Sequence, residues 1–339
     1  MIKEAISSLV SGNSLTMEQA SSVMEEIMDG SATQAQLGAF LVALKLKGET
    51  ADEVAGLASV MRAKSSRVSL AGPLIDIVGT GGDGSNTFNI STTAAFVMAG
   101  AGLRVAKHGN RAMSSRCGSA DVLEALGVKI ELKPEQVRSC VENVGIGFMF
   151  AQAFHPAMKY AAAPRREIGI RTVFNILGPL TNPAGVEFLV LGVPGEDLGD
   201  KIAEALCRLG TKRALVVHGL NGIDELSISG RSAVWEINDG CVTSARRYIC
   251  PEDVGLKGAD GGALTGGSPS QNANILHNVL NGERSARRDV VLLNAAAGIY
   301  TGRIAGSLRE AVSTAAEVID SGRAAGKLEQ LIAFSRNLE

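Results

Sequence analysis

The segment 74–92, LIDIVGTGGDGSNTFNIST, constrains the fold more than any other part of the sequence. A short run of β-branched residues leads into a loop with four glycines in six positions, and hydroxyl and amide side chains then open an apolar helix. Such a unit predicts a phosphate site, because glycine lets backbone N–H groups approach an anion near the positive end of a helix. Asp83 would repel a bare pyrophosphate, so a cation or a ligand hydroxyl is also expected nearby.

Two well-known nucleotide-binding loops match this segment only in part. Gly79, Gly81 and Gly84 fit the G-x-G-x-x-G pattern of dinucleotide-binding proteins, which also requires an acidic residue at the end of the next strand. That strand ends instead in Lys107 and His108. A Walker A loop would need Gly-Lys-Ser or Gly-Lys-Thr after the glycines, and neither occurs. The loop therefore predicts a phosphate site of another kind.

From residue 74 onward, apolar segments of strand length alternate with helical ones. This alternation predicts an α/β fold with a central, mainly parallel sheet flanked by helices. The expected strands are Leu74–Val78, Leu103–Ala106, Val128–Leu132, Ile146–Phe150, Glu187–Val193, Ala214–His218 and Ser232–Ile237. The expected helices are Thr92–Ala101, Ala120–Leu126, Pro134–Val144, His155–Ile168 and Leu198–Leu209. The glycine-rich stretch 255–267 is expected to be a surface loop.

The first seventy residues predict a separate, all-helical unit. An initial helix is expected over Ile2–Val10, and capping boxes open three more helices at Thr16 with Gln19, Thr33 with Gln36 and Thr50 with Glu53. Their apolar stripe could be core or a dimer face: Leu37, Phe40, Leu41 and Leu44. We therefore expect a small α-helical domain over residues 1–70 and a larger α/β domain over residues 71–339.

Composition narrows the functional classes. The 33 basic and 35 acidic side chains among 339 residues nearly cancel, so neither nucleic acid nor a membrane surface is an expected partner. No apolar stretch is long enough to span a bilayer, and the first residues do not resemble a signal peptide. The five cysteines form no C-x-x-C pair, which favours reduced thiols. We therefore expect a cytoplasmic protein.

Two further loops follow other strands that are expected in the same sheet. The first, KHGNRAMSSRCGSAD over residues 107–121, interleaves cations and hydroxyls with glycine and forms a second anion cradle. The second, GLNGIDEL, carries the adjacent carboxylates Asp224 and Glu225, which can share Mg²⁺ coordination. Ligands of such sheets lie beyond the carboxyl ends of the strands, so the three loops should form one site. Together they predict a sugar pyrophosphate whose charge is neutralised by Mg²⁺ and whose pyrophosphate leaves in the reaction.

Four segments in this order resemble the anthranilate phosphoribosyltransferase family: GTGGDGSNTFNIST, KHGNRAMSSRCGSADVLEALG, HPAMKYAAAPRREIGIRTVFNILGPLTNPAG and GLNGIDEL. The resemblance covers nearly the whole chain. It implies transfer of the 5-phosphoribosyl group of phosphoribosyl pyrophosphate to the amine of anthranilate, a step of tryptophan biosynthesis. It also implies a homodimer formed through the helical domain, with residues 155–185 near a hinge.

The resemblance also implies roles for individual residues. Phosphoribosyl pyrophosphate would be bound by Gly79, Gly82, Asp83, Thr87, Asn89, Ile90, Ser91, Thr92, Lys107, His108, Gly109, Asn110, Arg111, Ala112, Met113, Ser114, Ser115 and Ser119. Anthranilate would be bound by Gly79, Asn110 and Arg165, whose guanidinium suits an aromatic carboxylate. Mg²⁺, as two ions per subunit, would be held by Ser91, Asp224 and Glu225. His108 is a candidate proton acceptor, although attack on a cation-like carbon needs little help from a base.

Two places depart from the family pattern. Ala151-Gln152 replaces the common FAP, and AAAPRR places its proline one position later than APVRR, so the helix just before Arg165 is expected to be disturbed. Two alternative functions remain open. One is a pyrimidine nucleoside phosphorylase, which would need no Mg²⁺ and is disfavoured by Asp224 and Glu225. The other is a non-catalytic relative that binds nucleic acid, which the near-neutral charge disfavours.

Overall fold

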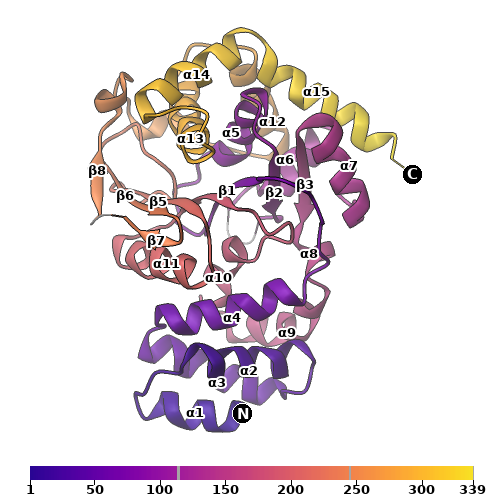
Figure 1. Cartoon of the computed structure of the whole chain (residues 1–339), viewed down its shortest axis with the longest axis vertical. Coiled ribbons are helices and arrows are strands. Elements are labelled where there is room, and N and C mark those ends of the chain that lie inside the picture. The colour runs from indigo at the N-terminus through magenta and orange to yellow at the C-terminus, as the bar shows by residue number, and fades with distance from the viewer. Residues whose placement is uncertain (113–114, 244–245, 339) are drawn as a thin grey trace.

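The computed structural model describes residues 1–112, 115–243 and 246–338. A layer of helices at one end of the molecule packs beneath a larger α/β unit, in which the sheet separates this layer from the C-terminal helices (Figure 1). The strands are β1 (Ile75–Gly79), β2 (Val105–Gly109), β3 (Ile146–Phe150), β4 (Phe188–Gly192), β5 (Arg213–Gly219), β6 (Ser232–Asn238), β7 (Cys241–Val242) and β8 (Arg247–Ile249).

The helices fall into three groups along the chain. The N-terminal helices are α1 (Ile2–Val10), α2 (Met17–Met28), α3 (Gln34–Lys47) and α4 (Ala51–Ala63). Those between the strands are α5 (Ile90–Gly100), α6 (Ser119–Ala125), α7 (Pro134–Val144), α8 (Ala151–Phe154), α9 (Lys159–Ile168), α10 (Phe174–Leu177) and α11 (Glu196–Arg208). The C-terminal ones are α12 (Pro269–Leu280), α13 (Ala286–Thr301), α14 (Leu308–Asp320) and α15 (Arg323–Arg336). Short 3₁₀ turns are η1 (Pro156–Met158), η2 (Gly178–Leu180), η3 (Pro251–Val254) and η4 (Gly261–Leu264).

All three predicted capping boxes are present at the starts of α2, α3 and α4. In each, the threonine side chain accepts a hydrogen bond from the backbone N–H three residues later, and the side chain at that position caps the threonine in return. The predicted apolar stripe is buried within the single chain, with Leu37, Phe40, Leu41 and Leu44 each no more than 2% exposed. It therefore belongs to the core of the helical unit and not to a free face.

The sheet reverses its direction of growth at β1. Its strand order is β3-β2-β1-β4-β5-β6-β7, and β8 pairs with the other part of β6. The first five strands in this order, β3, β2, β1, β4 and β5, are all parallel, whereas β6 runs antiparallel to β5. The chain adds β2 and β3 on one side of β1 and then places β4 on the other side. The loops that follow β1 and β4 therefore leave in different directions and open a crevice at the carboxyl ends of these strands, where α/β proteins of this type bind ligands.

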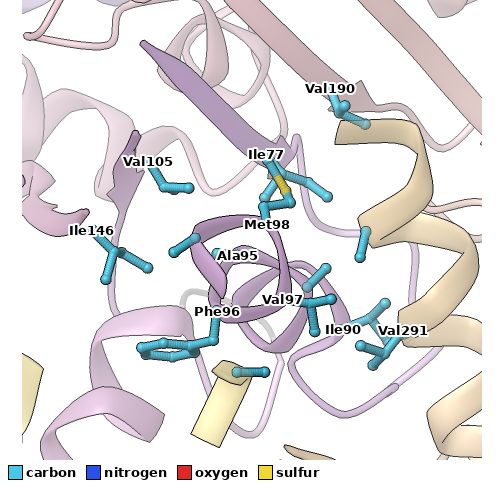
Figure 2. Packing of buried hydrophobic residues seen from close by; sticks show 14 of the residues in the cluster. Ile77, Ile90, Ala95, Phe96, Val97, Met98, Val105, Ile146, Val190 and Val291 are labelled. Carbon is cyan, nitrogen blue, oxygen red and sulfur yellow. The ribbon is translucent and has the colours of Figure 1, made fainter. Parts of the chain in front are cut away.

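Two apolar layers sandwich the sheet because its side chains alternate between the faces. On one face, Val190 and Leu215 pack with α5 and α13. Figure 2 shows α5 at the centre of this layer, with Met98 beside Ile77 of β1 and the Phe96 ring on the side of the helix turned away from Ile77 and Val105. On the other face, β4 and β5 pack with α11 and the N-terminal helices.

Two predicted elements are wrong. Residues 128–132 are not a strand: Val128, Ile130 and Leu132 are buried alternately, but this segment pairs with no strand, and Lys129 donates its backbone N–H to Ser335 Oγ in α15. The alternation of apolar residues therefore reflects burial of one side of this segment and not pairing in a sheet. The predicted helix 155–168 begins instead as η1 and becomes α-helical at Lys159. Pro164 lies inside α9 without ending it, and the helix ends at Gly169 in a left-handed conformation.

Helix α9 packs on α2 and α3, so residues predicted to lie near a hinge contact the helical unit. The short strands β7 and β8 were not expected from the sequence; both are brief and mostly exposed. Among the described residues, no helix has the length and apolarity needed to cross a membrane.

Substitution of Glu53 tests how much a buried ion pair contributes to the stability of the helical unit. It is fully buried, pairs with Lys47 at 2.8 Å and accepts backbone hydrogen bonds from Leu15 and Thr50. Glu53→Ala should lower the free energy of unfolding by about 3 kcal/mol, because Lys47 would be left buried without its partner. Gln36→Ala removes the equivalent, half-buried capping side chain of α3 and should cost about 1 kcal/mol. Urea unfolding followed by circular dichroism measures both, and equal losses would show that the buried ion pair adds nothing beyond the cap.

Candidate functional site

Two glycines at the ends of paired strands make room for Asp224. Gly79 of β1 and Gly192 of β4 are opposite each other in the register of the sheet. A Cβ atom at Gly79 would lie 2.2 Å from Asp224 Oδ2, and one at Gly192 would lie 1.6 Å from the Asp224 backbone oxygen. The carboxyl ends of these strands therefore receive the loop after β5 only because both positions lack a side chain.

Three carboxylates gather at this edge of the sheet. Asp83 Oδ2 accepts a long hydrogen bond, 3.4 Å, from the Asp224 backbone N–H, and Asp224 Oδ2 accepts one of 2.7 Å from Gly81. Burial and the nearby charge of Asp83 raise the pKa of Asp224 to about 7. Burial and the charge of Asp224 raise the pKa of Glu225 well above its ordinary value. Burial and mutual repulsion therefore destabilise the charged forms of Asp224 and Glu225, and a bound cation would offset both effects.

Lys107 is the buried cation whose charge acts on this cluster. It is 3% exposed, and its Nζ donates a 2.7 Å hydrogen bond to the Ile77 carbonyl. Burial lowers the pKa of Lys107, while the charges of Asp76 and Glu225 oppose that shift. Asp76, to which no sequence motif pointed, is fully buried and accepts hydrogen bonds from the His108 backbone and the Asn182 side chain. It therefore ties the end of β2 to β1 beneath the site.

The start of α5 faces the same carboxylates. The Ser91 backbone N–H donates to Glu225 Oε1 at 3.2 Å. Asn89 joins neighbouring segments, since its Nδ2 donates to the Cys117 carbonyl and its Oδ1 accepts from Asn272. Ile90 and Thr92 are each 1% exposed, so their side chains are buried and not free to contact a ligand. Thr87 forms an isolated antiparallel β-bridge with Thr265. The glycine-rich stretch 255–267 therefore lies beside the loop that follows β1.

The second anion loop is organised by Asp121, another residue that the sequence motifs did not single out. Asp121 Oδ2 accepts from the backbone N–H groups of Ala112 and Gly118, both at 2.9 Å. Arg111 turns its side chain to Asp121 and Glu124, so its guanidinium is already paired. The remaining predicted residues of this loop that the structure describes are Gly109 and Asn110 at its start, Ser119, whose Oγ donates to the Asn110 carbonyl, and the exposed Ser115. Met113 and Ser114 lie outside the described residues.

His108 and His155 form a buried pair with ring centroids 5.1 Å apart. Burial lowers the pKa of His108 to about 3 and that of His155 to about 4, so both rings are neutral near pH 7. Neither Nε2 atom has a hydrogen-bond partner among the described residues. Two buried polar atoms without partners indicate that a ligand or solvent completes this pocket.

Arg165 is a half-buried cation that forms no ion pair with a described residue. Its guanidinium stacks on the Phe174 ring at 4.9 Å, and burial lowers its pKa. The segment that follows α9 returns to the glycine loop, where Arg171 donates hydrogen bonds to the carbonyls of Gly81 and Gly82. Arg165 is therefore available to an anion, on a segment that also contacts the predicted phosphate loop.

The donor set fits Mg²⁺ when a ligand contributes oxygens as well. Within residues 1–112, 115–243 and 246–338, no three histidine, cysteine or carboxylate side chains form a complete metal cage. Mg²⁺ commonly binds one or two carboxylates and completes its coordination with substrate phosphates and water. Asp224 and Glu225, with Asp83 beside them, supply such a partial set.

Comparison with known proteins gives a consistent result over the whole chain. Residues 3–65 match a family described as "Glycosyl transferase family, helical bundle domain", and residues 71–325 match "Glycosyl transferase family, a/b domain". An anthranilate phosphoribosyltransferase of Dehalococcoides mccartyi is 60% identical over 338 residues, covering 100% of this chain and 99% of the relative.

Two solved structures extend the likeness to the fold. The crystal structure of anthranilate phosphoribosyltransferase from Thermus thermophilus has a TM-score of 0.93 and 47% identity, covering 98% of this chain and 99% of that one. The Saccharomyces cerevisiae enzyme in complex with PRPP and Mg has a TM-score of 0.91 and 29% identity, covering 99% and 98%. The fold, the arrangement of the loops and these likenesses together show that the chain belongs to the anthranilate phosphoribosyltransferase family.

Proposed function

We propose that this chain transfers the 5-phosphoribosyl group of phosphoribosyl pyrophosphate to the amine of anthranilate, with release of pyrophosphate. One observation carries the proposal. The amides of the glycine loop, the buried Lys107 and a cluster of carboxylates with raised pKa values lie together at the switch point of the sheet. A sugar pyrophosphate with its metal satisfies all three. The family membership supports the same reaction.

The first substrate is proposed to lie across the ends of β1 and β2. The glycine loop from Gly79, the start of α5 and the loop after Lys107 would supply amides, hydroxyls and the ammonium group to its phosphates. Ser91, Asp224 and Glu225 are proposed to hold two Mg²⁺ ions per subunit. Mg²⁺, when bound, would stabilise the departing pyrophosphate. Asp83 adds negative charge beside a sugar carbon that becomes cation-like as the bond to pyrophosphate breaks.

Anthranilate is proposed to bind Arg165 through its carboxylate, with Gly79 and Asn110 placing its amine near the sugar. The unpaired, half-buried guanidinium of Arg165 supports this assignment. His108 is better suited to hydrogen bonding than to proton transfer, because burial lowers its pKa to about 3. We therefore assign no general base, and the amine would lose its proton after the bond to carbon forms.

The reaction has a direct test. Purified protein mixed with anthranilate, phosphoribosyl pyrophosphate and Mg²⁺ should consume anthranilate, which is followed as a loss of its fluorescence. A sample with a chelator in place of Mg²⁺ is the control and should show no loss. Consumption of anthranilate that is independent of Mg²⁺, or no consumption at all, would reject the proposal.

Glu225→Gln keeps the shape of the side chain and removes one charge from the cluster. Apparent Mg²⁺ affinity should fall by at least about 10- to 100-fold, the range found when even outer partners of a metal site are lost. Steady-state rates measured against Mg²⁺ concentration check this, and Asp83→Asn should act on the same titration. Glu283→Gln, at an exposed glutamate after α12, is the matched control. An unchanged Mg²⁺ titration for Glu225→Gln would remove Glu225 from the site.

Arg165→Ala should raise the KM for anthranilate by about 10- to 100-fold, because a hydrogen bond to a charged group contributes about 1.5–3 kcal/mol. The KM for phosphoribosyl pyrophosphate should change much less. Arg166→Ala alters the exposed neighbour and serves as the control. Normal anthranilate kinetics in Arg165→Ala would contradict the assignment.

The helical unit over residues 1–70 is proposed as a dimerisation domain, and residues 71–339 as the catalytic domain. Large exposed apolar side chains occur on the helical unit and on the segment packed against it: Met1, Val10, Leu46, Tyr160 and Ile170. Burial of these side chains against a second copy would remove them from water. The free cysteines support our proposal of a reducing, cytoplasmic location.

A further inference from the structure

Arg171 holds two successive peptide groups of the glycine loop. Its Nη1 donates to the Gly82 carbonyl at 2.8 Å, and its Nη2 donates to the Gly81 carbonyl at 3.0 Å. The residue lies between α9 and α10, about ninety positions away along the chain. This two-pronged contact therefore joins the segment after α9 to the loop that follows β1.

Fixing the carbonyls also fixes the amides. A trans peptide group is planar, so its N–H points away from its C=O, and no peptide bond of the described chain is cis. The peptide groups held by Arg171 carry the N–H groups of Gly82 and Asp83. Neither of these N–H groups donates to any residue that the structure describes. Both are therefore directed away from the guanidinium and are available to an anion.

The loop is also fastened on its other side. The Gly81 N–H donates to Asp224 Oδ2 at 2.7 Å, so Arg171 and Asp224 hold adjacent peptide groups. Both glycines have φ of +70°. A Cβ at Gly82 would lie 1.3 Å from Arg171 Nη1, whereas one at Gly81 would meet nothing within 4 Å. A side chain at position 82 would therefore displace the Arg171 guanidinium and would also strain the backbone.

We propose that Arg171 is a positioning residue for the phosphate-bearing substrate, an inference that rests on the proposed function. By binding the carbonyls of Gly81 and Gly82, it presents the N–H groups of Gly82 and Asp83 to the pyrophosphate as a preformed pair of donors. A charged donor on each carbonyl also polarises the peptide group and strengthens the N–H on its far side. Arg171 acts through the loop and does not touch the ligand.

Arg171→Met tests the proposal, because methionine keeps an apolar stem without the donors. Calorimetry with phosphoribosyl pyrophosphate and Mg²⁺, in the absence of anthranilate, should show affinity reduced about 10- to 100-fold, as for other partners that orient a binding group. The KM for this substrate should rise in parallel, while the KM for anthranilate stays close to the wild-type value. Unchanged binding in Arg171→Met, with normal binding by the wild type, would overturn the proposal.

Two further variants separate positioning from charge and from folding. Arg336→Met is the matched control: Arg336 Nε donates to the Gly127 carbonyl at 2.7 Å, and a Cβ at Gly127 would lie 2.1 Å from its Nη2, far along the chain from the loop. It should bind the substrate normally. Arg171→Lys keeps the charge but cannot donate to both carbonyls as a fork, so it should resemble Arg171→Met.

The outcomes are distinct. Wild-type affinity in Arg171→Lys would show that charge alone is needed, which overturns the positioning role. Stronger salt dependence in the wild type than in Arg171→Met would point to direct contact between Arg171 and the ligand, and would also overturn it. Absence of binding by the wild-type protein would reject the proposed function itself, independently of Arg171.

Discussion

The parallel pairing of β1 with β4 decides where the rest of the site lies. Five residues of each strand pair in register, from Ile75 with Phe188 to Gly79 with Gly192, so both strands stop at the same level. Because β2 lies on the far side of β1, the loops after β1 and β4 leave in different directions. Asp224 enters the opening from the loop after β5, above two positions that carry no Cβ. The geometry of the sheet thus places a carboxylate beside the glycine loop that follows β1.

Hydrogen-bond donors are distributed unevenly among the carboxylates in this opening. The charges of two acidic groups, Asp76 and Glu225, act on Lys107 and oppose the lowering of its pKa by burial. Asp76 accepts three hydrogen bonds, two from backbone N–H groups and one from Asn182, which oppose but do not cancel the rise in its pKa caused by burial. Asp224 and Glu225 have fewer donors and repel each other. The hydrogen-bond donors are therefore concentrated on Asp76, and the two carboxylates of the loop after β5 have fewer.

Local signals in the sequence were sufficient for elements whose cause is local. Each capping box depends on side chains three residues apart, and all three were predicted correctly. The strand expected at residues 128–132 failed because alternating burial there arises from packing beneath α15, with Ser335 as a backbone partner, and strand pairing is not a local property. The roles of Arg171 and Asp76 were not predicted for the same reason, because both form hydrogen bonds to residues far away in the sequence. The sequence therefore identifies the loops of the candidate site but not the hydrogen bonds that hold them in place.

The path of the chain after α9 has a thermodynamic consequence. Arg165 stacks on Phe174. Arg171 lies between these two residues in the sequence and donates hydrogen bonds to the loop after β1. A ligand that orders this segment by binding Arg165 alters the freedom of Arg171, and a ligand that orders the loop alters the freedom of Arg165. Linkage requires the two effects to be equal in free energy. On the proposed assignments, this short stretch of backbone would couple the affinities of the two substrates before their reacting atoms meet.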